Sequence, residues 1–279
     1  MRVGFLGPSG TYAEEALRAS APADEAVDEI PFPTVYETVM AVQSGAVDRA
    51  VVPIENSLEG SVTTTLDTLT DEAGRVRIVA EVVRPISHSL VARPGVAIEQ
   101  LVRVVSHPQA LAQCRRFLRE AVPKASTESA GSTADAVRAV AASDEPLGAL
   151  GTPLAAELYG CAVLAEAVED GAENLTRFVW LAPDGSAAMG GRPDKTSVVF
   201  WGFNDDSPGA LVRLLAELAD RSINLTKIES RPRRVRLGHY MFFADLDGAA
   251  EDEHVAEALD ALRGHVETLK ILGSYPAAS

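Results

Sequence analysis

The sequence contains few basic residues, few cysteines and no long uncharged run. Its 25 Lys and Arg stand against 40 Asp and Glu, which gives a net charge of −15. Because a chain with this negative charge repels a phosphate backbone, we do not expect a nucleic-acid partner. No apolar run is long enough to cross a bilayer, so we expect no membrane partner either. Residues 1–25 lack the basic start and apolar core of a signal peptide.

Cysteine is scarce as well. The two cysteines, Cys114 and Cys161, show no metal-ligand spacing, and we expect buried thiols in a reducing cytoplasm. Apolar residues, by contrast, are abundant: they make up 47% of the 279 residues, which excludes global disorder. The length suits two domains of unequal size.

Residues 1–182 alternate apolar runs with amphipathic segments. Alternating strands and helices indicate βαβ units, a largely parallel sheet and thus an α/β fold. The β-branched run 75–92, interrupted by Pro85, predicts a strand that crosses between two lobes. Capping-box patterns predict that helices begin at Thr11 and Thr34. The other expected elements are strands at 2–6, 49–54, 102–105 and 147–150 and helices at 108–120 and 133–142.

A different order of strands and helices follows a segment that has no regular pattern. Residues 182–193 are rich in Gly, Pro and Ala and have no period, which is typical of a linker. The segments beyond it predict strands at 196–203, 224–230, 239–246 and 266–272 and helices at 208–221 and 251–264. This βαββαβ order is the ferredoxin-like arrangement. We therefore expect an α/β domain at 1–182, a linker at 183–194, a ferredoxin-like domain at 195–273 and a tail at 274–279.

Small and hydroxyl residues gather where strands meet helices. Such junctions present free backbone N–H groups at the positive ends of helix dipoles, and in open α/β sheets they line the crevice that binds ligands. Four junctions facing one cleft would hold an anion with several acceptor oxygens. Ordinary capping explains Thr11, Thr152 and Ser61 equally well. The junctions are residues 7–11, 56–61, 106–108 and 151–153.

Two further segments carry candidate site residues. Glu55, Asn56 and Ser57 directly follow a buried strand, where polar groups are costly unless they pair or bind a ligand. An Asx-type turn with a solvated Glu55 is the alternative. Strand alternation places Thr176 and Phe178 on one face and Arg177 on the other, unless the strand starts after Thr176. Arg177 is suited to clamp a carboxylate, or else to form a surface salt bridge.

The motifs together resemble a known family along nearly the whole chain. Six of them occur in order: GPSGTYAEEA (7–16), PIENSLEG (53–60), SHPQALAQC (106–114), NLTRF (174–178), GAL (209–211) and ESRP (229–232). The chain is thereby identified as similar to monofunctional prephenate dehydratases. The resemblance implies a two-lobed catalytic domain like a type 2 periplasmic binding protein, followed by an ACT domain. It also implies conversion of prephenate to phenylpyruvate, water and CO2 in L-phenylalanine biosynthesis, without a metal or organic cofactor.

The resemblance further implies roles for individual residues. Thr176 would be the essential hydrogen-bond donor, and Glu55 is the candidate for the ultimate proton source. Phenylalanine would bind as an allosteric effector between the ACT domains of a homodimer or homotetramer. The implied substrate contacts are Ser9, Thr11, Asn56, Ser57, Arg177 and Phe178, and the implied effector contacts are Gly209, Ala210, Leu211, Asn224, Glu229 and Ser230.

Other functions remain open at this point. Arogenate dehydratase performs the same chemistry on the aminated substrate, and no residue pattern in the sequence decides between the two. A non-catalytic intracellular ligand sensor would share the cleft and the amino-acid module. The intact NLTRF motif favours an enzyme, because binding alone would not require that residue set.

Overall fold

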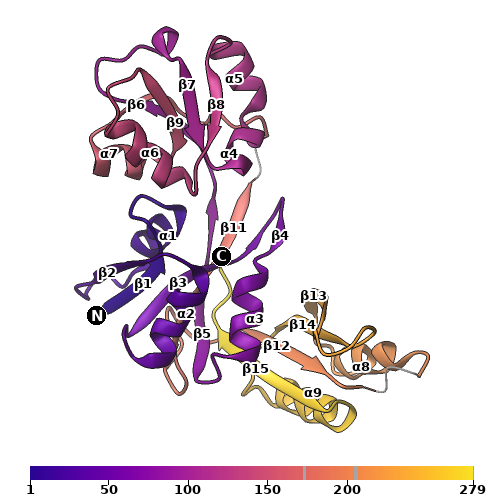
Figure 1. Ribbon diagram of the computed structural model, residues 1–279. Coiled ribbons are helices and arrows are strands. Elements are labelled where there is room, and N and C mark those ends of the chain that lie inside the picture. Colours follow the sequence, from indigo (N-terminus) through magenta and orange to yellow (C-terminus); the bar gives the residue numbers. More distant parts are fainter. Residues whose placement is uncertain (172–173, 204–206, 279) are drawn as a thin grey trace.

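The computed structural model describes residues 1–171, 174–203 and 207–278. Three bodies follow one another in Figure 1: a lobe at the N-terminus, a second lobe above it, and a smaller unit that ends the chain. Within the described residues, no helix is long and apolar enough to cross a membrane.

The first lobe is built on a mixed sheet with strand order β5-β11-β3-β1-β2. β1 pairs in parallel with β2 and β3, whereas β11 runs antiparallel to both β3 and β5. Its strands are β1 (Arg2–Leu6), β2 (Asp28–Phe32), β3 (Arg49–Asn56), β4 (Gly60–Ser61), β5 (Val76–Pro85) and β11 (Leu175–Pro183), and its helices are α1 (Tyr12–Ser20), α2 (Val35–Ser44) and α3 (Thr63–Asp71).

The second lobe has its own sheet, with strand order β10-β6-β9-β7-β8. The helix expected at 108–120 is two helices, because the backbone at Cys114 leaves the helical region (φ −110°, ψ 19°). The elements are β6 (Ser89–Ala92), the short 3-10 helix η1 (Ile98–Gln100), β7 (Arg103–Ser106), α4 (Pro108–Gln113), α5 (Arg115–Ala121), β8 (Ser126–Ser129), α6 (Thr133–Ala141), β9 (Leu147–Gly151), α7 (Pro153–Tyr159) and β10 (Ala162–Ala165).

The chain passes between the lobes twice. The run 75–92 does cross, as expected, but as two strands: β5 ends at Pro85 in the first sheet and β6 begins at Ser89 in the second. The return leads from β10 to β11. The lobes also touch at Gly10, where an added Cβ would lie 2.7 Å from the Cβ of Ala155, and where φ is +91°. Only glycine suits both the close approach and the left-handed backbone.

The C-terminal unit is ferredoxin-like, as predicted. Its sheet order is β13-β14-β12-β15, with α8 and α9 packed on one face. The other face carries Val199, Trp201 and Phe243 into a core shared with α2 and α3 of the first lobe. The elements are β12 (Lys195–Trp201), α8 (Ala210–Ala219), β13 (Leu225–Pro232), β14 (Tyr240–Asp247), α9 (Glu253–His265) and β15 (Thr268–Tyr275).

One sheet runs through the first lobe and the C-terminal unit. β15 pairs with β5 where Gly273 lies opposite Ile78, and a Cβ at Gly273 would come within 2.2 Å of the Ile78 carbonyl oxygen. β15 extends beyond the predicted end at residue 272 to Tyr275. The Tyr275 side chain is fully buried and its hydroxyl hydrogen-bonds to Ser197, so it is part of the core and not of a tail.

Candidate active site

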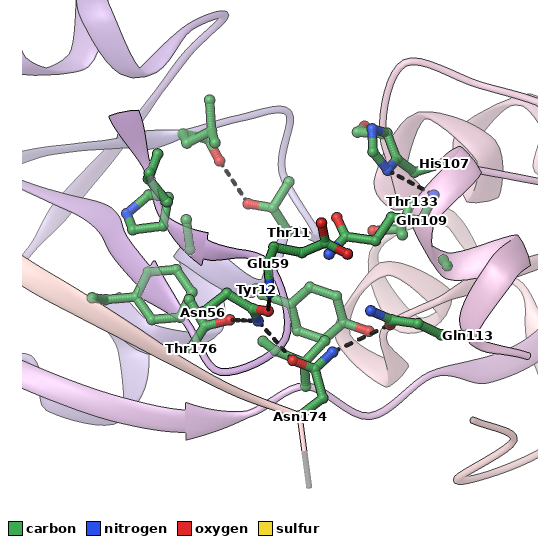
Figure 2. A pocket seen from close by; sticks show the side chains of 18 of the residues that line it. Thr11, Tyr12, Asn56, Glu59, His107, Gln109, Gln113, Thr133, Asn174 and Thr176 are labelled. Carbon is green, nitrogen blue, oxygen red and sulfur yellow. Dashed lines mark hydrogen bonds between the residues drawn. The ribbon is translucent and has the colours of Figure 1, made fainter. Parts of the chain in front are cut away.

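A cleft of about 370 Å³ lies between the two lobes and is walled by both (Figure 2). The first lobe contributes the start of α1, the end of β3 with the β4 turn, and the start of β11. The second lobe contributes α4 and the start of α6. The residues that line it are Leu6, Thr11, Tyr12, Ala13, Pro53, Asn56, Glu59, Gly60, Ser61, Val62, Ile86, His88, His107, Gln109, Ala110, Gln113, Gly131, Ser132, Thr133, Asn174, Thr176 and Phe178.

Helix N-termini supply much of this wall, as the sequence predicted, but not all from the expected junctions. The junctions at 7–11, 56–61 and 106–108 contribute lining residues. Thr152 lies outside the lining: its hydroxyl donates to the Gly10 carbonyl at 2.8 Å and accepts from the Ala155 N–H. The start of α6, with Ser132 as its N-cap and Thr133 as its first residue, lines the cleft instead.

Asn56 fixes the orientation of Thr176. The Asn56 Oδ1 accepts the backbone N–H groups of Leu58 and Glu59, both at 3.0 Å, so its Nδ2 must point the other way. That Nδ2 donates to Thr176 Oγ1 at 2.8 Å. Because the threonine oxygen is the acceptor of this bond, and no acceptor for its own proton occurs in the described part of the chain, the Thr176 O–H is free to donate into the cleft.

The same amide begins a hydrogen-bond chain across the floor of the cleft. Asn56 Nδ2 also donates to Asn174 Oδ1 at 2.6 Å, and Asn174 Nδ2 donates to Gln113 Oε1 at 3.2 Å. The Gln113 Nε2 is buried and has no hydrogen-bond partner among the described residues. A buried donor without a partner is costly, so this N–H group is suited to bind a ligand.

Four of the predicted catalytic-domain residues line the cleft: Thr11, Asn56, Thr176 and Phe178. Thr176 and Phe178 share a face of β11, as alternation predicted. Thr11 is the N-cap residue of α1, but the predicted capping box is absent. Its hydroxyl makes no capping bond and donates to the Leu6 carbonyl at 2.7 Å, and the Glu14 carboxylate accepts the N–H of Gly10 at 2.6 Å, one residue before the expected position.

Two other predicted contacts serve the scaffold. Ser57 Oγ accepts the Leu175 N–H at 2.9 Å and thereby ties β11 to the end of β3. The Ser9 carbonyl accepts a hydrogen bond from Tyr159 of the second lobe at 2.8 Å. Neither residue lines the cleft.

Glu55 and Arg177 do not reach the cleft either. They are cross-strand neighbours of β3 and β11, whose pairing places them on the face opposite Asn56 and Thr176. Arg177 pairs with Glu55 at 2.9 Å, Glu81 at 3.1 Å and Asp245 at 2.8 Å. Burial by itself would lower the pKa of Arg177, but the acidic neighbours, Asp245 foremost, raise it well above its ordinary value. The residue therefore joins the first lobe to β14 and does not clamp a ligand.

Several lining residues were not singled out from the sequence. Gln113 and Asn174 lie within the SHPQALAQC and NLTRF motifs, so the motifs carried the signal although the individual residues were not chosen. Tyr12 and Glu59 lie in the GPSGTYAEEA and PIENSLEG motifs. His88 lies in no motif, and only the crossover of the chain brings it to the cleft.

The cleft has an unusual charge distribution. Among the described lining residues, none is Lys or Arg, and Glu59 is the one carboxylate. Figure 2 shows the Glu59 and Gln109 side chains extending toward each other from opposite lobes. Burial lowers the pKa of His88, which favours the neutral imidazole. No group of three His, Cys, Asp or Glu side chains in the described ranges is placed to hold a metal ion.

The two cysteines are free thiols. Cys114 is buried, and burial raises its pKa to about 12, which makes it unreactive. Cys161 is only partly buried, contrary to the expectation.

A second cavity, of about 340 Å³, lies in the C-terminal unit. Gly209, Ala210 and Leu211 line it together with Phe203 and Phe242. The other three predicted effector contacts do not. Asn224 bonds to Asp247 at 2.9 Å, and Glu229 and Ser230 lie on β13, whose outer edge has no neighbouring strand among the described residues.

Side chains of β13 reach the rim of the cleft. Lys227 Nζ donates to Ser61 Oγ at 2.6 Å and pairs with Glu55 at 3.2 Å. The Ser61 hydroxyl in turn donates to Glu229. Since Ser61 also lines the cleft, these hydrogen bonds connect the C-terminal unit to the wall of the cleft.

The fold and this cleft define a class: a two-lobed α/β domain with a ligand cleft between its lobes, joined to a ferredoxin-like module. Comparison with known families gives the particular member of this class. The prephenate dehydratase model matches residues 3–186 and the ACT domain model matches residues 203–264. The chain belongs to the prephenate dehydratase family, whose members are lyases that convert prephenate to phenylpyruvate.

Related proteins match the sequence of this chain over nearly its full length. A prephenate dehydratase of Mycolicibacterium vanbaalenii is 42% identical over 98% of this chain and 90% of its own. Arogenate dehydratase 1 of Petunia hybrida is 39% identical over 99% of this chain and 67% of its own.

Solved structures share the fold. The prephenate dehydratase of Arthrobacter aurescens in complex with L-Phe superposes with a TM-score of 0.88 at 40% identity, over 100% of this chain and 90% of the other. GqqA, described as a novel type of quorum-quenching acylase, superposes with a TM-score of 0.89 at 31% identity, over 100% and 98%.

Proposed function

We propose that the chain dehydrates and decarboxylates prephenate to phenylpyruvate in the cleft between its lobes. The observation that carries the proposal is the orientation of Thr176, whose oxygen accepts from Asn56 and whose proton is left for the substrate. The reaction breaks the bond from the ring to the departing carboxylate and the bond to the ring hydroxyl, and the electron pair of the first bond completes the aromatic ring. The hydroxide that leaves takes up one proton to become water. A donor held at this oxygen lowers the barrier.

The charge of the cleft suits the same chemistry. The two substrate carboxylates meet neutral donors: the N-termini of α1 and α6 and the Gln113 amide. Because the described lining offers no Lys or Arg, the departing carboxylate gains no ion pair that would hold it in its charged form. Phe178 is placed to pack against the ring that becomes aromatic.

The direct test is turnover of prephenate by the purified protein, followed by the absorbance of phenylpyruvate and by CO2 release. Equal amounts of both products support the proposal. Folded protein that forms neither product refutes it.

Arogenate is the second candidate substrate, because relatives of Petunia hybrida at 39–40% identity are named arogenate dehydratases. The two substrates differ only in the side chain that does not react, so the same cleft chemistry applies to both. Comparing kcat/KM for the two substrates in one preparation decides between them.

The proposal includes feedback control by phenylalanine. The cavity at Gly209, Ala210 and Leu211 is apolar and aromatic enough for a phenyl ring, and the L-Phe complex of the Arthrobacter aurescens relative supports this ligand. The exposed edge of β13, with Glu229 and Ser230, would complete the site from a second copy of the chain in a homodimer or homotetramer. The two free thiols accord with a cytoplasmic location.

Lys227 is the contact through which phenylalanine would act on the cleft. Lys227→Met removes its bonds to Ser61 and Glu55, and we expect the half-inhibitory concentration of phenylalanine to rise about tenfold, within the usual range of coupling energies. Lys227→Arg keeps the charge and is the matched control. Unchanged inhibition in Lys227→Met would exclude this route.

A further inference from the structure

His88 occupies a special place between the lobes. It lies on the crossover from β5 to β6, its side chain is buried (3% exposed), and it lines the cleft. Both ring nitrogens are bonded, each to a different lobe. Nδ1 lies 2.7 Å from the Tyr12 hydroxyl at the start of α1, and Nε2 lies 2.9 Å from Gln113 Oε1 at the end of α4.

The hydrogen-bond chain determines which nitrogen of His88 carries the proton. The N–H groups of Leu58 and Glu59 donate to Asn56 Oδ1, so the Asn56 amide can have only one orientation. Its Nδ2 donates to Asn174 Oδ1, which sets the orientation of the Asn174 amide. The Asn174 Nδ2 then donates to Gln113 Oε1. This oxygen can only accept, so His88 Nε2 must donate to it. In a neutral ring Nδ1 can then only accept, and the Tyr12 hydroxyl has two acceptors for its one proton, His88 Nδ1 and the Ser87 carbonyl oxygen, each at 2.7 Å.

We propose that His88 is a positioning residue for the dehydration. Its ring, protonated at Nε2, donates to the Gln113 side-chain oxygen and so holds the Gln113 amide with its own unpartnered N–H group, on Gln113 Nε2, facing the substrate. This inference deepens the proposed function and depends on it. Gln113 Oε1 accepts two hydrogen bonds, one from His88 and one from Asn174. Both bonds would be lost if the Gln113 amide rotated by 180° and exchanged its oxygen and nitrogen. Figure 2 shows the Gln113 side chain reaching from α4 toward Tyr12 and the cleft.

The surroundings of His88 fit a positioning role and not that of a proton source. The titratable groups around it are Tyr12 from α1, Cys114 beside Gln113, and Glu169, which accepts the His88 backbone N–H at 2.9 Å. Burial lowers the pKa of His88, against the opposing effects of the Gln113 bond and of Glu169. A neutral ring keeps the N–H donor that the Gln113 oxygen requires, and its other nitrogen is an acceptor that the Tyr12 hydroxyl shares with the Ser87 carbonyl.

Two substitutions of His88 separate the two bonds. Asn can reach only the place of Nδ1, so His88→Asn keeps an acceptor for Tyr12 and loses the donor to Gln113. Gln can place an N–H near the position of Nε2. We expect kcat/KM to fall about tenfold in His88→Asn, the loss of roughly one buried hydrogen bond, and less than threefold in His88→Gln. Similar losses in both variants, with unfolding midpoints that match, would overturn the proposal.

A double-mutant cycle tests whether His88 acts through Gln113. In a Gln113→Ala background the donor that His88 positions is gone, so adding His88→Asn should change kcat/KM less than twofold. A general structural role would multiply the two losses instead, because independent effects add in free energy. A multiplied loss, or full activity in Gln113→Ala, refutes the proposal.

Nitrogen NMR of the full chain, labelled at its five histidines, reads the tautomer without any turnover. The His88 signal, assigned by its absence in His88→Gln, should show a neutral ring protonated at Nε2 near pH 7. Protonation at Nδ1 overturns the proposal. If the wild-type protein fails to convert prephenate, the proposed function fails by that assay, and the tautomer still decides whether His88 orients Gln113.

Discussion

Thr176→Val isolates the donor on which the proposed chemistry depends. Valine keeps the shape and the β-branching of threonine but removes the hydroxyl, and Thr176 is nearly buried, so solvent cannot replace the lost group easily. Removing one donor aimed at a developing negative charge typically costs about 10²–10³-fold in kcat, or ~2.7–4 kcal/mol. We expect kcat to fall by that factor while KM changes little.

The cost in stability should be much smaller. Asn56 Nδ2 loses Thr176 Oγ1 but keeps Asn174 Oδ1 at 2.6 Å, so the free energy of unfolding should drop by about 1 kcal/mol, the worth of one ordinary hydrogen bond. Thr196→Val is the matched control, because Thr196 is fully buried on β12 and its hydroxyl donates to the Gly248 carbonyl at 2.8 Å, far from the cleft. This control should lose stability without losing kcat.

The assay is phenylpyruvate formation at saturating prephenate, with urea unfolding measured on the same preparations. Thr176→Ser retains a hydroxyl and should keep kcat within about tenfold of the wild type. If Thr176→Val is folded and its kcat stays within threefold of the wild type, the assignment of Thr176 as the donor is wrong.

Three further predictions concern the scaffold. Arg177→Met leaves buried carboxylates such as Asp245 without their cation, so urea unfolding should show a loss of about 3–5 kcal/mol, and a loss below 1 kcal/mol would contradict the ion network. Gly273→Ala places a Cβ against the Ile78 carbonyl, where β15 joins β5, so the melting temperature should fall and β5 should lose hydrogen-exchange protection; an unchanged melting curve would show that the sheet yields there. His88 has a folded-state pKa below its ordinary 6.5, so the unfolded chain binds its proton first, and stability should decline as the pH falls from about 6.5 toward the folded-state value. His88→Gln should lack that part of the decline in urea unfolding at a series of pH values, and parallel curves would show that His88 contributes none of it.

Local pattern was sufficient for most of the fold. The period of the apolar residues predicted the βαββαβ unit and most elements of both lobes, because burying one face of a strand or helix leaves a trace in the sequence at spacing 2 or 3.6. The elements β2, α3, β8 and β10 were not predicted, and the helix boundary at Cys114 and the end of β15 at Tyr275 were missed. These two boundaries lie at contacts with distant segments: at the start of α5 the Arg116 N–H donates to the Asp170 carboxylate at 2.8 Å, and at the end of β15 the Tyr275 hydroxyl hydrogen-bonds to Ser197.

Some features of the site also follow from local sequence pattern, and others depend on tertiary contacts. The sequence by itself determined that Thr176 and Phe178 share a face of one strand, because alternation is a local property. It could not tell that Glu55 and Arg177 face Asp245 and Lys227 across a domain boundary and turn away from the cleft. Nor could it place His88 beside Gln113. Those outcomes were decided by the tertiary structure, because the partner that satisfies a buried charge or amide can come from any part of the chain, and only packing brings it within hydrogen-bond reach.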